Sequence, residues 1–203
     1  MTATKGRGQL VALEGIDGAG KSTLARAIVR RLRARGYSVA LRREPADPVL
    51  GRLAQAASVT DAWTGAVYFT LDRFLARPQL QRQLARHDFV ISDRSFYSTL
   101  AYQGSALDIG ERRRLAALQR TATITPDRVI LVDLEPSEAV RRLGRRGGGR
   151  GPLERRRVLE RVARAYRQLA RAPRWRAVDG SQSPAALVDA ALAAMPPRRR
   201  TRT

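Results

Sequence analysis

The residues best suited to chemistry form a glycine-rich stretch near the start of the chain. Residues 15–22 read GIDGAGKS, which fits the pattern G-x-x-x-x-G-K-[ST]. Its glycines allow backbone N–H groups to surround phosphate oxygens, and the helix that follows adds the positive end of its dipole. We expect Lys21 to reach the outer phosphates of a nucleoside triphosphate and Ser22 to bind Mg²⁺. The residues assigned to the triphosphate are Gly15, Gly18, Ala19, Gly20, Lys21, Ser22 and Thr23.

Lysine is rare in this chain, although basic residues are abundant. Lys5 and Lys21 are the two lysines among 39 Lys and Arg residues, and with 18 Asp and Glu residues the net charge is +21. A lysine kept at position 21, in a chain that otherwise uses arginine, supports a specific role there. The excess charge permits nucleic-acid binding, but the arginines are spread from residue 7 to residue 202. We interpret the charge mainly as a compositional bias and expect no specific nucleic-acid partner.

A second group of polar residues follows two apolar stretches. Asp93 and Arg94 come just after the apolar residues 89–91, and Arg43 comes just after residues 39–41. If both stretches are parallel strands, these side chains meet at the carboxyl edge of the sheet, where α/β proteins bind ligands. An aspartate there suits a Mg²⁺ shell and an arginine suits a phosphate. A surface ion pair is the alternative interpretation.

An aromatic residue and an arginine share one face of a predicted helix. Phe69 and Arg73 are four residues apart, so they are neighbours on the helix surface. The pair suits stacking on a base and hydrogen bonding to its edge. A core phenylalanine beside a solvated arginine is the alternative.

Short apolar stretches that alternate with helical patterns must position these residues. The predicted strands are residues 10–13, 39–41, 89–91, 129–132 and 175–178. The predicted helices are residues 21–36, 64–76, 79–85, 111–120, 159–169 and a last helix that begins at Ser183-Pro184. This alternation predicts an α/β fold of the P-loop NTPase class, with three α/β/α layers and a five-stranded parallel sheet.

The 203 residues suit a single domain, which we place at residues 1–195. An arginine-rich segment at about residues 144–155 is expected to be mobile, and residues 196–203 are expected to form a basic disordered tail. The absence of cysteine excludes a disulfide scaffold, a thiolate metal site and a cysteine nucleophile. With no long apolar run and no apolar signal core, we expect a cytoplasmic protein without a membrane partner.

Together these motifs resemble the thymidylate kinase family of P-loop nucleoside monophosphate kinases. The matching segments are residues 13–23 (LEGIDGAGKST), 43–45 (REP), 72–73 (DR), 93–94 (DR), 98–104 (STLAYQG), 126–133 (PDRVILVD) and 179–183 (DGSQS). They occur in the family's order over about residues 9–190. The resemblance implies Mg²⁺-assisted transfer of the ATP γ-phosphoryl group to the 5′-phosphate of dTMP, for dTTP biosynthesis. It also implies a homodimer, for which the apolar helical segments after Thr64 and Ser95 are the candidate faces.

The resemblance also implies residue roles. Arg43 and Arg94 would hold the acceptor phosphate, and Asp93 would join Ser22 at Mg²⁺. Tyr102 would pack where a ribose 2′-hydroxyl would project. The acceptor-binding residues implied are Asp17, Arg43, Phe69, Arg73, Arg94, Ser98, Thr99, Tyr102 and Gln103. The catalytic residues implied are Asp17, Lys21, Asp93, Arg94, Arg146 and Arg150.

The arginine-rich segment matches the family's lid in position and composition. Some members carry an arginine in the phosphate loop, but Gly18 occupies that position here, so the lid is expected to supply the arginine. The candidates are Arg145, Arg146, Arg150 and Arg155. The chain departs from the family at residues 46–48, at Ser95 and loosely at Thr99, which bears on base selection more than on phosphoryl chemistry.

Three other functions remain open at this point. A deoxynucleoside kinase would phosphorylate a hydroxyl group, with Glu44 as its base. A broader nucleoside monophosphate kinase would accept several bases. A basic P-loop ATPase that binds nucleic acid would show steep salt dependence.

Overall fold

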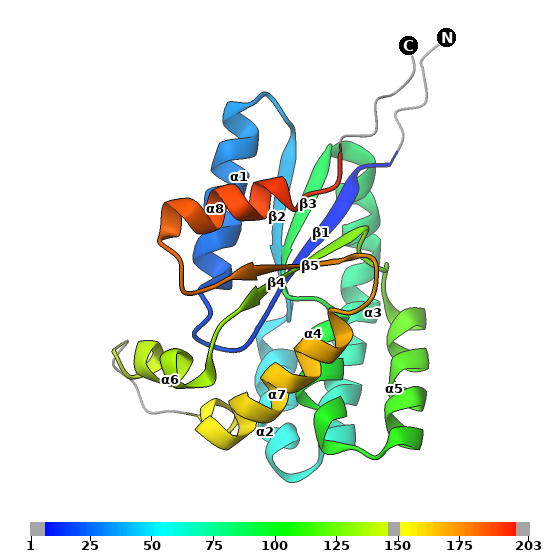
Figure 1. Ribbon diagram of the computed structural model, residues 1–203. Helices are drawn as coiled ribbons and strands as arrows, with labels where there is room; N and C mark the ends of the chain where they lie inside the picture. The colour runs from blue at the N-terminus through cyan, green and yellow to red at the C-terminus, as the bar shows by residue number, and fades with distance from the viewer. Residues whose placement is uncertain (1–6, 146–150, 198–203) are drawn as a thin grey trace.

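The computed structural model describes residues 7–145 and 151–197 of the chain. Its centre is a five-stranded sheet in the order β2-β3-β1-β4-β5 (Figure 1), and every neighbouring pair of strands is parallel. The strands are β1 (Gln9–Glu14), β2 (Val39–Arg43), β3 (Phe89–Asp93), β4 (Arg128–Asp133) and β5 (Trp175–Asp179). The predicted five parallel strands are confirmed.

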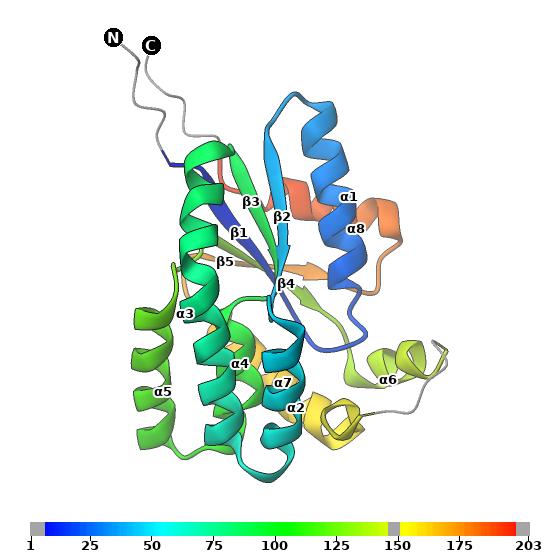
Figure 2. The same ribbon diagram turned by 180° about the vertical axis from the view of Figure 1, so that it is seen from behind.

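Helices cover both faces of the sheet and complete the three predicted layers. α1 and α8 lie on one face, and α3, α5 and α7 lie on the other (Figures 1 and 2). The helices are α1 (Lys21–Ala34), α2 (Pro48–Thr60), α3 (Ala62–Arg86), α4 (Phe96–Tyr102), α5 (Ile109–Ala122), α6 (Pro136–Gly144), α7 (Arg156–Leu169) and α8 (Pro184–Ala193). Two single turns of 3₁₀ helix, η1 (Gly104–Ala106) and η2 (Pro152–Glu154), stand between them.

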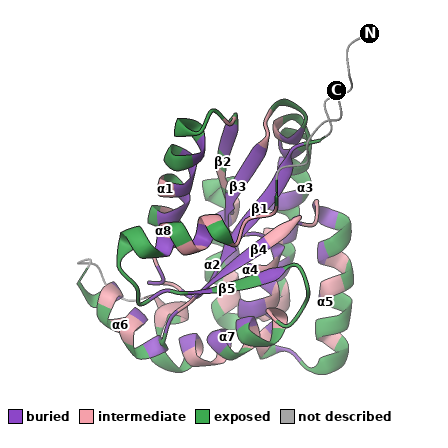
Figure 3. Ribbon diagram, turned by 45° about the horizontal axis from the view of Figure 1, so that its top comes forward, coloured by how far each residue is buried: buried purple, intermediate pink, exposed green. Residues whose placement is uncertain are grey.

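Alternation of side chains along the strands explains the two layers of helices. Leu10 and Val90 lie in one cluster with Leu80 of α3, while Val11 of the same strand as Leu10 lies in the larger core with Ile28 of α1. Because successive side chains of a strand point to opposite faces, β1, β2 and β3 each supply residues to both clusters. The strands are buried along most of their length, whereas the outer faces of the helices are exposed (Figure 3).

One prediction about the helices was wrong. Residues 64–76 and 79–85 were expected to form two helices separated at Pro78, but α3 runs without interruption from Ala62 to Arg86. A proline inside a helix removes one backbone hydrogen bond. Ala76 and Leu80, on either side of Pro78, are both buried. Their burial favours a continuous helix over a break at this point.

Three short helices, α2, α4 and α6, were not predicted. Each begins with a local start signal: Asp47 caps α2 through its side chain, Ser95 caps α4, and Pro136 opens α6. They surround the carboxyl edge of the sheet (Figure 1), so they are the elements that enclose a ligand there.

The two ends of the described chain meet at the opposite, amino edge of the sheet. The side-chain amide of Gln9, at the start of β1, donates to the carbonyl oxygen of Pro197 at 3.0 Å. Within the described ranges, no helix is both long enough and apolar enough to cross a membrane. The expected disordered tail lies mostly outside the described residues.

Candidate active site

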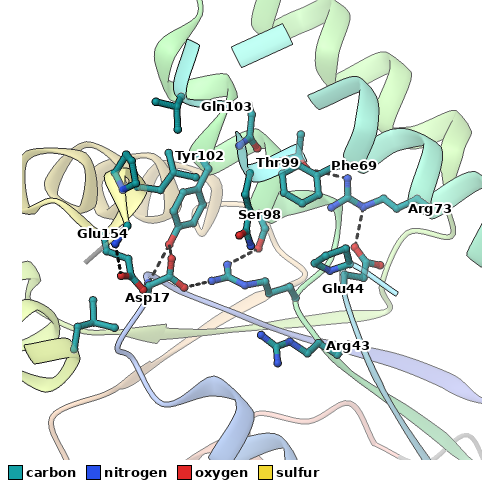
Figure 4. Close-up of a pocket in the computed structure, with 18 residues that line it drawn as sticks. Asp17, Arg43, Glu44, Phe69, Arg73, Ser98, Thr99, Tyr102, Gln103 and Glu154 are labelled. Carbon is teal, nitrogen blue, oxygen red and sulfur yellow. Dashed lines mark hydrogen bonds and ion pairs between the residues drawn. The ribbon is translucent and has the colours of Figure 1, made fainter. Parts of the chain in front are cut away.

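A cavity of about 470 Å³ opens at the carboxyl edge of the sheet, beside the ends of β1, β2 and β3. Its walls come from the loop after β1, from α3 and α4, and from the segment before α7 (Figure 4). All nine residues that the sequence assigned to the acceptor line it: Asp17, Arg43, Phe69, Arg73, Arg94, Ser98, Thr99, Tyr102 and Gln103. Residues from four separate parts of the chain therefore meet in one cavity.

The glycine-rich loop after β1 takes the shape that a phosphate cradle needs. Gly15, Gly18 and Gly20 have φ angles of 144°, 87° and 92°, a region that favours glycine. A Cβ atom on Gly15 would lie 2.6 Å from the carbonyl oxygen of Val132 in β4. The loop is thus packed against the neighbouring strand, and α1 begins directly after it at Lys21.

Lys21 is buried beneath this loop. Its Nζ donates to the carbonyl oxygen of Ile16 at 2.8 Å. Burial, together with the nearby charge of Arg94, lowers the pKa of Lys21 to about 8. Asp17, Asp93 and Glu14 partly offset this shift, but burial outweighs them, so the ammonium group is suited to receive the negative charge of a phosphate.

Ser22 and Asp93 form the candidate magnesium site. The Ser22 hydroxyl donates to Asp93 Oδ2 at 2.5 Å, which links the first turn of α1 to the end of β3. Among the described residues no group of three His, Cys, Asp or Glu side chains could hold a metal. One hydroxyl and one carboxylate nevertheless suit Mg²⁺, which takes its remaining oxygen ligands from water and phosphates.

Arg94 lines the cavity beside Asp17 and has an unusual backbone conformation. It has a φ of 76°, and its carbonyl oxygen accepts a hydrogen bond from the Ser92 hydroxyl at 2.6 Å. Its guanidinium group forms an ion pair with Asp17 and lies 5.4 Å from the ring centre of Tyr102. Burial alone would lower the pKa of Arg94, but Asp17 and Tyr102 raise it well above its usual value. Arg94 is therefore a permanent cation at the end of β3.

Tyr102 and Asp17 bind one another through two hydrogen bonds. The Tyr102 hydroxyl donates to Asp17 Oδ2 at 2.9 Å and accepts from the Asp17 backbone N–H at 3.0 Å. Burial, followed by the charge of Asp17, raises the pKa of Tyr102. The phenol therefore stays neutral and ties α4 to the phosphate loop.

Arg73 lies at the other end of the cavity, beside Phe69. Its guanidinium carbon is 5.9 Å from the ring centre of Phe69. Its Nε donates to Glu44 at 2.8 Å, and both side chains are buried. Glu44 is thus already paired with a buried cation, which disfavours its use as a base for a hydroxyl acceptor.

The Ser98 hydroxyl is already engaged within the cavity wall. It donates to Glu14 at 2.7 Å and accepts from Arg94 at 3.0 Å. In this arrangement Ser98 holds the Arg94 side chain beside the phosphate loop. Gln103 donates through its amide to Ser58 of α2 at 3.0 Å.

Residues 13–191 match the sequence model of the family Thymidylate kinase. The chain belongs to the thymidylate kinase family. A probable thymidylate kinase of Thermococcus gammatolerans is 38% identical over 157 residues, which cover 68% of this chain and 72% of the relative. A probable thymidylate kinase of Thermoplasma acidophilum is 31% identical over 185 residues, covering 88% and 91%. The thymidylate kinase of Halorhodospira halophila is 33% identical over 190 residues, covering 87% and 88%.

In this member of the thymidylate kinase family, the cavity also contains the carboxylate of Glu154, which the sequence analysis did not assign to the site. Glu154 lines the cavity and accepts from the backbone N–H of Gly151 at 3.0 Å. No periodicity or familiar motif marks it, because it lies in the single turn η2 just after the arginine-rich segment. Arg145 and Arg155 are exposed, and the expected catalytic residues Arg146 and Arg150 lie outside the described residues.

Glu14 is a second residue that was not assigned a role. It is fully buried at the end of β1 and accepts hydrogen bonds from Ser95 N–H, Ser95 Oγ, Ser98 Oγ and Tyr166 OH at 2.7–2.8 Å. Burial raises the pKa of Glu14, although these hydrogen bonds counteract the shift. The only available signal was an acidic residue at the end of an apolar strand.

A second cavity, of about 770 Å³, lies on the other side of the phosphate loop. Gly20 and Thr23 line it together with Arg142, Gly180 and residues of α8. The phosphate loop therefore has a cavity at each side, as a two-substrate kinase requires.

Proposed function

We propose that this protein transfers the γ-phosphoryl group of ATP to the 5′-phosphate of dTMP, giving dTDP and ADP. The observation that carries this proposal is the cavity with Arg94 beside the phosphate loop at one end and the Phe69–Arg73 pair at the other. A phosphate at Arg94 and a base at Phe69 fit a nucleoside monophosphate that spans the cavity. The names of the similar kinases support thymine as the base.

The chain's contribution to the reaction is positioning and charge. Lys21 and the N–H groups of the phosphate loop would hold the outer phosphates of ATP, whose base would enter the second cavity. Arg94 and Arg43 would hold the acceptor phosphate in line with the γ-phosphate. Phosphoryl transfer has a transition state with dispersed negative charge, so aligned cations lower its energy without forming a covalent bond to the protein.

Mg²⁺ fits at the pair Ser22 and Asp93. When bound, it would neutralise negative charge on the ATP phosphates. The Asp93 carboxylate, held by the Ser22 hydroxyl at 2.5 Å, is already placed between the phosphate loop and Arg94. An arginine of the segment 144–155, with Arg146 and Arg150 as first candidates, would complete the charge around the transferred group.

Tyr102 is proposed to favour deoxyribose. The guanidinium carbon of Arg94 lies 5.4 Å from the centre of its ring, and its hydroxyl donates a hydrogen bond to Asp17 at 2.9 Å. A rigid ring in this position leaves no room for a 2′-hydroxyl on a sugar that contacts Asp17.

An apolar face on α3 is proposed to join two copies of the chain in a cytoplasmic homodimer. Val67, Leu71, Phe74 and Leu75 are 52%, 43%, 45% and 66% exposed. Their spacing of four, three and one residues places them on one side of the helix. A row of large apolar side chains of this kind is typical of a protein interface.

A coupled ADP-release assay with ATP and Mg²⁺ tests the proposed reaction. We would compare dTMP, dUMP, dCMP, UMP and thymidine at equal concentrations. The proposal expects dTMP to be preferred, with UMP and thymidine poor acceptors. Preference for thymidine would instead indicate a hydroxyl acceptor, and no turnover with any acceptor would overturn the assignment.

A further inference from the structure

The hydrogen bonds around Arg73 account for nearly all of its donors. A guanidinium group has five N–H donors and no acceptor. Nε donates to Glu44 at 2.8 Å, NH1 donates to Thr99 and to Gln119 at 2.9 Å each, and NH2 donates to the Ser95 carbonyl oxygen at 3.2 Å. One N–H of NH2 remains, on a side chain that lines the cavity.

Gln119 holds this arginine from outside the cavity. It lies in α5, is fully buried and is absent from the cavity wall. Its Nε2 donates to Thr70 Oγ1 at 2.6 Å, while the Thr70 hydroxyl itself donates to the carbonyl oxygen of Ala66 at 2.6 Å. Because Thr70 has its one hydrogen committed to a carbonyl, it only accepts from Gln119. This bond therefore fixes the amide orientation, with Oε1 facing Arg73.

The Thr99 hydroxyl has a hydrogen that a ligand in the cavity can accept. Thr99 Oγ1 accepts from Arg73 at 2.9 Å, so its own hydrogen points elsewhere. Within the part of the chain that the structure describes, no acceptor takes that hydrogen, and Thr99 lines the cavity. The cavity wall beside Phe69 thus offers two hydrogens, one from Arg73 and one from Thr99.

We propose that Gln119, oriented by Thr70, is a positioning residue for base selection: it holds Arg73 so that the remaining N–H of the guanidinium group, with the Thr99 hydroxyl beside it, faces the exocyclic group at position 4 of a pyrimidine. A carbonyl oxygen, as in thymine or uracil, accepts from these donors. The amino group of cytosine is itself a donor and cannot accept from the Arg73 N–H, which leaves this buried donor without a partner. This inference rests on the proposed function, because it requires a pyrimidine base beside Phe69.

The test compares kcat/KM for dTMP, dCMP and dUMP in wild type and Gln119→Met. Methionine has a similar volume but offers Arg73 no amide oxygen. We expect the preference for dTMP over dCMP to fall by about tenfold, which is the usual effect of losing one hydrogen bond to a charged group. The preference for dTMP over dUMP should stay unchanged, because both bases carry a carbonyl oxygen at position 4. The KM for ATP should also stay unchanged.

Leu115→Val is the matched control. Leu115 is fully buried one turn earlier in α5, in a cluster with Ala66 and Leu107, and makes no hydrogen bond to Arg73. It should lower thermal stability without changing either ratio.

An unchanged dTMP:dCMP ratio in Gln119→Met would overturn the proposal, as would loss of that ratio in Leu115→Val. If wild type phosphorylates none of the three monophosphates, the proposed function fails. If wild type prefers dTMP and Gln119→Met keeps that preference, only the role of Gln119 fails.

Discussion

Two cationic side chains, Lys21 and Arg94, lie at the phosphate loop. Lys21 is buried with a lowered pKa of about 8, and Arg94 is a permanent cation paired with Asp17. An anion bound beside Lys21 favours the protonated form of this buried amine. Recognition at this scale therefore depends on the protonation state of Lys21.

ATP affinity is expected to fall as the pH rises above 8. At pH 7 Lys21 is protonated in the free protein, and phosphates favour the protonated form. Above its pKa of about 8, binding must first return a proton to Lys21, so Kd should increase by up to about tenfold per pH unit. Titration with ATP by calorimetry between pH 7 and 9.5 measures this dependence.

Lys21→Arg is the control for this titration. Arginine keeps its charge throughout the range, so the variant should bind ATP with little dependence on pH above 8. A flat profile in wild type, or the same slope in both proteins, would contradict the assigned role of Lys21.

At the scale of elements, the phosphate loop is held by close contact with its neighbours. A methyl group added at Gly15 would place its carbon 2.6 Å from the backbone of β4 at Val132. The loop, β4 and the start of α1 thus form one packed unit, and Asp93 of β3 joins it through Ser22. A change in the loop backbone must disturb both stability and the placement of Lys21.

Gly15→Ala should lower the free energy of unfolding by about 2 kcal/mol or more, because strain at a positive φ adds to a clash with backbone. It should also weaken ATP binding. Gly36→Ala is the matched control, since Gly36 has a φ of 82° but no atom within 4 Å of its added Cβ. This substitution should lower the free energy of unfolding by about 1 kcal/mol without changing ATP affinity. Denaturant unfolding and ATP titration check both variants; equal effects in the two would rule out the clash at Val132.

Sequence patterns predicted the strands well because each is a short apolar stretch that ends at a glycine or a polar residue. The same patterns missed α2, α4 and α6. α4 and α6 have only seven and nine residues, too few to repeat a helical spacing, and α2 buries only Gly51 and Ala54, so no stripe of large apolar residues marks a buried face. Capping residues such as Asp47 were the available signal for α2. The continuity of α3 through Pro78 depends on tertiary burial of Leu80, which local pattern does not report.

The candidate site was predictable where a side chain points into the cavity from a recognisable motif. Ser98 matches such a motif, but the motif does not reveal that its hydroxyl is bound by Glu14 and Arg94. Gln119 acts from a helix 46 residues away from Arg73 along the chain. Contacts of this kind depend on how helices pack together, and the pattern of residue types along the sequence does not show them.

The whole molecule presents an apolar face on α3 and a large positive charge, and these have opposite effects on association. Net charge of +21 opposes self-association at low ionic strength, while exposed Val67, Leu71, Phe74 and Leu75 favour it. The proposed homodimer should therefore form more readily as salt screens the charge.

Leu75→Glu should weaken the dimer by about tenfold or more, because Leu75 is 66% exposed on the apolar face and a buried unpaired carboxylate is costly. Sedimentation equilibrium at moderate salt gives the dissociation constant. Ile109→Glu, at a residue 65% exposed at the start of α5, is the control and should leave it unchanged. A wild-type protein that stays monomeric at every salt concentration would refute the proposed interface.

The bond between the Gln9 side-chain amide and the Pro197 carbonyl oxygen, at 3.0 Å, ties the start of β1 to the end of the described chain. This contact lies at the amino edge of the sheet, whereas Arg43 and Arg94 of the cavity lie at the carboxyl ends of β2 and β3. A short linker could join the two ends, and the chain could then be opened in a surface loop such as the one between α5 and β4. Such a circular permutant would keep the cavity whole, because the new connection would lie at the edge of the sheet opposite the cavity.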